Sequence, residues 1–114
     1  MAIIGTHSVL YTSEPEALRA VLRDVFGFEH VDAGGGWLIF ALPRAEVGIH
    51  PGEAPAHELT FMCDDIEQTI AELRAKGIEF KGEPQDARFG VAATMVLPGG
   101  VDVMLYEPKH PTAI

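Results

Sequence analysis

Along the chain, stretches with the hydrophobic spacing of a strand are followed by stretches with the hydrophobic spacing of a helix. The first strand and helix of this kind lie near the N-terminus. Residues Ile3 to Tyr11 are rich in β-branched and aromatic types, which favours a strand. In the segment SEPEALRAVLRDVFG that follows, the apolar residues at helical spacing are Leu18, Val21, Leu22 and Val25. Ser13 and Glu16 form a capping-box pattern at its start, and Gly27 is a typical helix stop. We therefore predict a strand followed by a helix.

Three short strands are expected to complete the first half of the chain. They span residues 28–32, 37–42 and 46–50. A run of three glycines, residues 34–36, separates the first two, and PRA separates the last two, as is typical of turns. The first half, about residues 1–50, is therefore predicted to be a βαβββ module.

The second half repeats this order after the linker PGEAPA, residues 51–56. Its predicted strands span 57–63, 78–81, 92–97 and 101–106. A helix follows the first of them, with Asp64 or Asp65 as its cap and Ile66, Ile70 and Leu73 on one face. Gly77 ends this helix as Gly27 ends the first one. The second module thus covers about residues 57–107, and residues 108–114 form a tail.

Two βαβββ modules, each with one helix on one face of its sheet, leave the other face of each sheet uncovered. Curling the two sheets toward each other buries those faces and encloses a cleft, a usual place for a small-molecule site. We therefore expect one α+β domain over residues 1–114, in which two βαβββ modules form a curled mixed sheet around a cleft.

The charge balance narrows the range of partners. The chain carries 17 Asp and Glu against 8 Lys and Arg, a formal net charge of -9. An acidic protein repels phosphate backbones and anionic membranes, so we expect no nucleic-acid or membrane partner.

The lone cysteine, Cys63, cannot form an internal disulfide, and no apolar run approaches the roughly 20 residues of a membrane span. MAIIGTHSVL also lacks the pattern of a signal peptide, so the expected location is the cytoplasm.

Three motifs of this chain together suggest a known family. His7 lies 20 residues before the glycine of VFGFE, FMCDDIEQTIAELRAKGIEF reads as strand, acidic cap, helix, glycine and strand, and Phe89-Gly90 is followed by LPGGVDVMLYEP. These motifs resemble the vicinal oxygen chelate superfamily, which includes glyoxalases, extradiol dioxygenases, fosfomycin-resistance proteins and bleomycin-binding proteins. The last motif resembles its closing hairpin, although Leu97 and Gly99 replace the acidic residues usual there. The resemblance implies the glyoxalase/bleomycin-resistance/dioxygenase fold and, as in many members, a homodimer.

The resemblance also implies a divalent metal (Zn, Ni, Mn or Fe) held by up to four side chains in the cleft. His7 matches the ligand position of the first strand. Aligning the second helix and its glycine stop places Glu58, not His57, at the corresponding position of the second module. The two last-strand positions fall on Gly48 and Met104, which are poor choices for a hard metal ion. The coordination sphere is therefore half empty.

His50 offers one way to complete it. It lies two residues beyond Gly48 on the same strand face, about 6.5–7 Å along the strand. The candidate metal ligands are therefore His7, His50 and Glu58, a composition that suits a non-haem metal. Without a metal, Glu58 requires another partner, either His7 or a cationic group of a ligand.

Strand alternation predicts the remaining cleft residues. Leu59, Phe61 and Cys63 form the apolar set expected beneath the helix, so Glu58, Thr60 and Met62 point into the cleft. Glu58 is also the candidate catalytic base. The candidate ligand-binding residues are Tyr11, Trp37, Thr60, Met62, Met104 and Tyr106. Aromatic and thioether side chains of this kind suit flat organic ligands.

Three classes of function remain open. The leading interpretation is a small protein that binds an organic ligand in its cleft; as an enzyme, it would be a metal-dependent lyase or isomerase of glyoxalase type. Dioxygenase activity is less well supported, because Met104 replaces the usual last-strand carboxylate. The alternative that the resemblance implies is a metal-free protein that binds or sequesters a drug, as the bleomycin-binding members of that superfamily do. An interaction protein without a ligand would instead fill the cleft with its own side chains.

Overall fold

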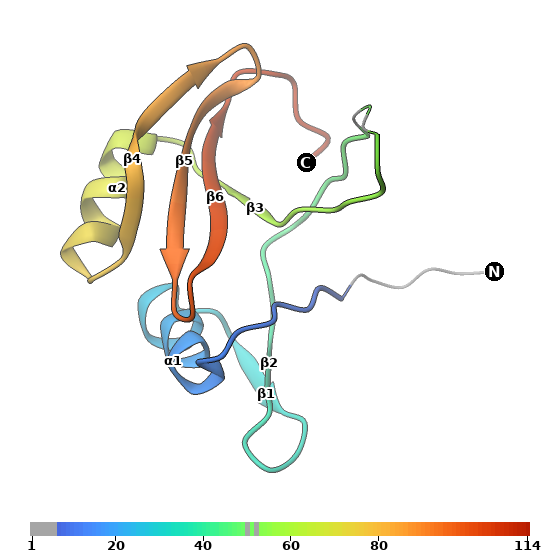
Figure 1. Cartoon of the computed structure of the whole chain (residues 1–114), viewed down its shortest axis with the longest axis vertical. Coiled ribbons are helices and arrows are strands. Elements are labelled where there is room, and N and C mark those ends of the chain that lie inside the picture. Colours follow the sequence, from blue (N-terminus) through green and yellow to red (C-terminus); the bar gives the residue numbers. More distant parts are fainter. Residues whose placement is uncertain (1–6, 50, 52) are drawn as a thin grey trace.

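The computed structural model describes residues 7–49, 51 and 53–114. The first half contains α1 (Pro15–Ala20), the π-helical turn η1 (Val21–Val25), β1 (His30–Asp32) and β2 (Leu38–Phe40). The second half contains β3 (Thr60–Met62), α2 (Ile66–Ala75), β4 (Glu79–Ala87), β5 (Gly90–Leu97) and β6 (Val101–Pro108). Figure 1 shows the second half as a sheet with α2 beside it, and the first half as α1, a small β-ladder and long extended segments.

The four strands of the second half form one mixed sheet in the order β3-β6-β5-β4. β3 runs parallel to β6, and the other neighbours are antiparallel. The register of β3 and β6 places Thr60 opposite Met104 and Met62 opposite Tyr106. The second half is therefore a βαβββ module, as its sequence pattern predicts. β1 and β2 form a separate two-stranded antiparallel ladder.

Helix α2 begins and ends where its sequence signals lie. The Asp65 carboxylate accepts a hydrogen bond from the Gln68 amide (3.1 Å), which identifies Asp65 as the cap. Gly77 adopts a positive φ of 92° directly after the helix, a conformation that glycine reaches without steric cost. The Ile78 amide then donates back to the Leu73 carbonyl (3.0 Å), which completes the helix stop.

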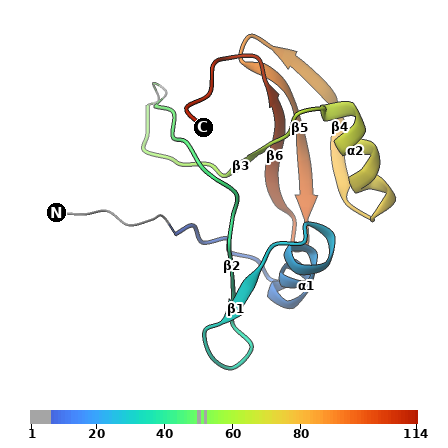
Figure 2. The ribbon, with the colours of Figure 1, turned by 180° about the vertical axis from the view of Figure 1, so that it is seen from behind.

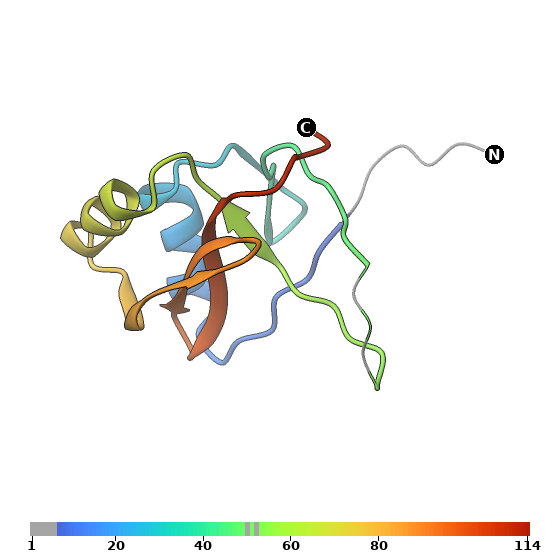
Figure 3. The same ribbon diagram turned by 90° about the horizontal axis from the view of Figure 1, so that it is seen from above.

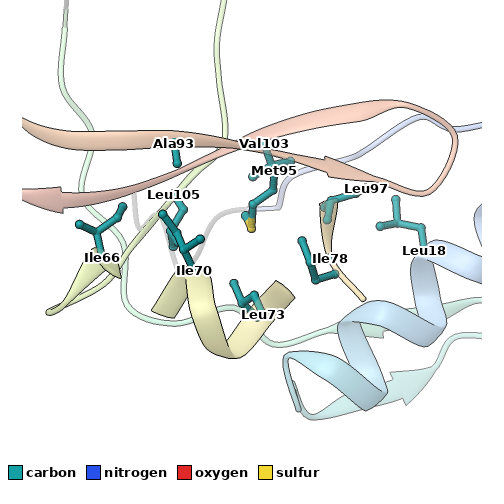
Figure 4. Packing of buried hydrophobic residues seen from close by; sticks show 10 residues of the cluster. All are labelled: Leu18, Ile66, Ile70, Leu73, Ile78, Ala93, Met95, Leu97, Val103 and Leu105. Carbon is teal, nitrogen blue, oxygen red and sulfur yellow. The ribbon is translucent and has the colours of Figure 1, made fainter. Parts of the chain in front are cut away.

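The hydrophobic core lies between the sheet and the helices. Figure 4 shows Ile70 and Leu73 of α2 beside Met95 and Leu105 of the sheet, and Leu18 of α1 near the Leu97 end of the same core. Met95 and Leu97 are the most completely buried large side chains. The predicted packing of Leu59, Phe61 and Cys63 against this core is confirmed. The alternation does not separate core residues from cleft residues here, because residues 59–63 all line the same cavity.

The first half departs from the predicted four-stranded module. The helix predicted from residue 15 to 25 is present, with π-helical geometry in its second part. Residues 7–11 and 46–49, however, form no strand. The other residues of these two predicted strands, 3–6 and His50, lie outside the described residues. A strand requires a neighbouring edge for its backbone hydrogen bonds, and α1 packs on the core of the second half rather than on a first-half sheet.

The predicted α+β class is confirmed, with one four-stranded sheet and a two-stranded ladder among the described residues. The curling of two sheets around a cleft is not confirmed. The radius of gyration of 15.1 Å exceeds the roughly 13 Å typical of a domain of this length, because the first half is extended. Figure 3 shows this layout from above, with both helices beside the sheet and extended chain on the other side. None of the helices formed by the described residues has the length and hydrophobicity needed to span a membrane.

Candidate functional site

A cleft of about 1500 Å³ runs along the free edge of β3. β3 pairs with β6 on one side only, so its other edge faces the extended segments of the first half. Figures 1 and 2 show this arrangement from opposite sides. The lining is mostly apolar and aromatic, and its aromatic members are Phe26, Phe28, Trp37, Phe40, Phe61 and Tyr106.

Three phenylalanines form the inner wall of the cleft. The rings of Phe26, Phe28 and Phe61 lie 5.6–5.8 Å apart, centroid to centroid, and each faces the other two in tilted or edge-on geometry. Phe26 and Phe28 flank the glycine that ends the first helix, and Phe61 comes from β3. This cluster joins the two halves of the chain, because aromatic rings in such geometry attract each other beyond their burial. The VFGF sequence is the only local signal for it.

Four of the six predicted ligand-binding residues border the cleft. They are Trp37, Thr60, Met62 and Tyr106. Tyr11 and Met104 lie outside its lining, although Met104 is the register partner of Thr60. Trp37 is exposed and the Arg19 guanidinium lies 5.9 Å from its ring centroid, so one face of the indole is held in place by a cation.

The ionisable residues of the predicted metal site lie at the mouth of this cleft. His7, His57 and Glu58 all border it and all are exposed to solvent. Residues 57–59 precede β3 as the structure has it, so the alternation that separates His57 from Glu58 is not enforced by a strand there. Within the described part of the chain, no hydrogen bond or ion pair joins His7 to Glu58. His50 lies outside the described residues.

The described donor groups do not fit a resident divalent metal. Among these residues, no three His, Cys, Asp or Glu side chains come together as a metal site would require. The two last-strand positions provide an exposed glycine, Gly48, and the thioether of Met104, which pairs with Thr60. The set of His7, His50 and Glu58 stays a prediction, because one of its members, His50, is not described.

A polar cluster that the sequence did not indicate lies at the Tyr106 end of the cleft. The Tyr106 hydroxyl lies 3.1 Å from His110 Nε2, and the His110 ring is tilted against the tyrosine ring at 5.9 Å. His110 Nδ1 lies 2.8 Å from the Pro111 carbonyl, which can only accept, so in neutral His110 Nε2 accepts from Tyr106. Burial raises the pKa of Tyr106, and the negative charge of Glu46 raises it further.

Cys63 does not provide a nucleophile at this site. It borders the cleft, half-buried, with its Sγ 3.7 Å from the Tyr106 carbonyl. Burial raises the pKa of the Cys63 thiol, and the nearby carboxylates of Glu107, Asp64 and Asp65 act in the same direction. The thiol therefore stays protonated at neutral pH, and the protonated form is a poor nucleophile.

The family comparison agrees with this fold. The family model described as Glyoxalase/Bleomycin resistance protein/Dioxygenase superfamily matches residues 6–110. The chain therefore belongs to this superfamily, which confirms the family indicated by the sequence motifs. No curated protein matches the chain.

Solved structures share the fold at low sequence identity. The chain is similar to TnmS3, an antibiotic binding protein from Streptomyces sp. CB03234, at 24% identity and a TM-score of 0.69, covering 96% of this chain and 99% of that one. It is also similar to lactoylglutathione lyase from Agrobacterium tumefaciens, at 21% identity and a TM-score of 0.66 over 93% and 92% of the two chains. A glyoxalase/bleomycin resistance protein from Streptomyces sp. CB03234 matches at 23% identity and a TM-score of 0.57, over 84% and 93%. At these identities the likeness concerns the fold alone.

Proposed function

We propose that this chain binds a small, flat organic molecule in the cleft along β3, without a resident metal. The observation that carries the proposal is the lining of the cleft, where aromatic and aliphatic side chains predominate. Pockets of this kind bind organic ligands by burying their apolar surface, while a few polar groups fix the orientation. The fold shared with an antibiotic binding protein is consistent with such a role.

The residues of the cleft suggest how the ligand is held. Trp37 offers an exposed indole face for stacking, and Met62 adapts to irregular shapes. The hydroxyls of Thr60 and Tyr106 can orient polar groups of the ligand. Glu58 at the mouth, together with the net charge of -9, favours a neutral or cationic molecule over an anionic one. Tyr11 and Met104 stay predictions as ligand contacts.

Titration with Nile red, a neutral flat dye, tests this proposal. Trp37 is the single tryptophan of the chain, so its fluorescence reports directly on the cleft. We expect saturable dye fluorescence with parallel quenching of Trp37. A Met62→Glu variant is expected to weaken binding by roughly tenfold or more, because it places a charge against an apolar ligand. The matched control is Val31→Glu, which is exposed on β1 and lies outside the cleft lining. Equal loss in both variants, or no saturation in the native chain, would contradict the proposal.

Glyoxalase-type catalysis is the competing function, with Glu58 as the base and His7, His50 and Glu58 as metal ligands. It is tested by the metal content of protein purified without chelators or affinity tags, and by the formation of S-lactoylglutathione from methylglyoxal and glutathione. Stoichiometric metal that is lost in His7→Ala, together with this activity, would replace the binding proposal. No activity with Zn, Ni, Mn or Fe added would leave binding as the function.

A homodimer also stays a prediction, as does a cytoplasmic location. What supports a second copy is the pattern of exposed apolar side chains in the first half, where Val47 and Ile49 are 86% and 92% exposed on a segment without strand partners among the described residues. Such segments can add to a sheet edge of another chain. Light scattering with size-exclusion chromatography is expected to give twice the monomer mass, and Ile49→Asp is expected to shift the protein toward monomer. A native chain that stays monomeric would contradict this.

A further inference from the structure

We propose that residues 109–114 form a strap across the Tyr106 end of the cleft, which opens to admit the ligand and closes behind it. This inference rests on the proposed function of the cleft. The chain turns back after β6 (Figure 1), and Ile114 borders the cleft. The strap is attached at its base, along its length and at its tip by contacts to three different parts of the molecule.

The base of the strap is fixed to the sheet. The Lys109 amide donates to the Phe89 carbonyl (2.8 Å), and the Lys109 ammonium pairs with the Asp86 carboxylate (2.7 Å). Both partners belong to β4 or to the turn that follows it. These two contacts make Lys109 the fixed point from which the rest of the segment runs to Ile114, which borders the cleft.

The middle and the tip of the strap contact opposite walls of the cleft. His110 hydrogen-bonds the Tyr106 hydroxyl on β6 (3.1 Å). The Ala113 amide donates to the Glu46 carboxylate (2.6 Å), which lies on the extended segment of the first half, 67 positions earlier in the sequence. Ile114 borders both the main cleft and a smaller neighbouring groove. The strap therefore bridges the two walls between which a ligand would enter.

The location of these contacts explains why the strap can control entry. The other side-chain hydrogen bonds between the two halves of the described chain join Thr12 to Pro98 and Glu14 to Gly99, at the turn between β5 and β6. Within the described residues, the bond between Glu46 and Ala113 is the hydrogen bond that ties the 41–49 segment to the second half. Residues 111–114 are exposed, and single exposed hydrogen bonds contribute little net stability, so the strap opens without unfolding the core.

The kinetics of Nile red binding test the strap. In stopped-flow measurements, we expect Glu46→Ala to raise both the association and the dissociation rate several-fold, with a smaller change in the equilibrium constant. A residue that only contacts the ligand would change mainly the dissociation rate. His110→Ala, which removes the hydrogen bond to the Tyr106 hydroxyl, is also expected to raise both rates. The control is Glu83→Ala, which removes an equal charge from an exposed position on β4 outside the cleft lining. Rates in Glu46→Ala equal to those of the control would overturn the proposal.

Hydrogen exchange measured by NMR tests the strap without any ligand. The Ala113 amide is expected to exchange more slowly in the native chain and in Glu83→Ala than in Glu46→Ala, which lacks its acceptor. If Nile red fails to bind the native chain, the proposed function fails for a neutral aromatic ligand, while the exchange data still decide whether the strap is attached. An Ala113 amide that exchanges at the same rate in the native chain and in Glu46→Ala would overturn the strap itself.

Discussion

Gly99 packs against Thr12 so closely that a Cβ atom at position 99 would overlap the Thr12 hydroxyl oxygen. The Gly99 amide also donates to the Glu14 carboxylate (2.8 Å), and the Thr12 hydroxyl donates to the Pro98 carbonyl (2.7 Å). The turn between β5 and β6 is thereby fixed to the start of α1. An acidic residue at position 99, where relatives of this chain were expected to carry one, would both overlap Thr12 and repel Glu14. The glycine at position 99 thus suits the way this turn packs against Thr12 and Glu14.

Replacing Gly99 by alanine is expected to destabilise the protein by about 2–4 kcal/mol, because the new Cβ meets Thr12 and the backbone has a φ of +85°. Gly100→Ala is the matched control, since Gly100 also has a positive φ (+76°) but a Cβ added there would have open space within 4 Å. It is expected to cost only about 1 kcal/mol. Urea unfolding followed by circular dichroism measures both. Equal losses would show that the contact with Thr12 has no energetic role.

Asp65→Ala is expected to lower the free energy of unfolding by about 1 kcal/mol, because it removes the side chain that accepts from the Gln68 amide at the start of α2. Asp64→Ala removes the same charge one residue earlier, outside the cap position, and is expected to have a smaller effect. Chemical denaturation of the two variants gives the comparison. A larger loss of stability in Asp64→Ala would show that Asp64, and not Asp65, caps the helix.

Met95→Ala is expected to destabilise the protein by about 2–5 kcal/mol, since this side chain is completely buried between the sheet and the helices and its removal leaves a cavity. Met104→Ala removes the same atoms from the opposite face of the sheet, where the side chain is only partly buried. We expect a loss of roughly 1 kcal/mol there. Thermal and urea unfolding of the pair test whether the core lies on the helix side of the sheet.

Stability is expected to fall in alkaline solution. Burial raises the pKa of the Cys63 thiol in the folded protein, so above the ordinary thiol pKa of about 8.5 the unfolded chain loses this proton while the folded chain keeps it. Because the folded state then binds more protons, stability decreases as pH rises through this window. Tyr106, whose pKa is also raised by burial, acts likewise above about 10. Urea titrations at several pH values are expected to show a shallower alkaline decrease in Cys63→Ala. If stability decreases with pH equally steeply in Cys63→Ala and in the native chain, groups other than Cys63 cause the decrease.

Local sequence patterns were sufficient to predict the order of elements in the second half, although β4 extends to Ala87 rather than ending near residue 81. The resemblance of its motifs indicated the family. The cap at Asp65, the stop at Gly77 and the apolar face of α2 are local features, so they could be found without knowing what the helix packs against. The alternation at Leu59, Phe61 and Cys63 likewise identified the face of β3 that meets the core. These features were predictable because helical and strand periodicity are properties of neighbouring residues.

The arrangement of the first half and the closure of the cleft depend instead on tertiary contacts. Residues 7–11 and 46–49 have strand-like composition, but a strand forms only where another edge accepts its hydrogen bonds, and no described strand pairs with them. His110 contacts Tyr106 because the chain turns back after β6, and the bond that the Ala113 amide donates to Glu46 joins segments more than 60 positions apart. Neither composition nor spacing carries such information, since it depends on which distant segments the packed core brings together.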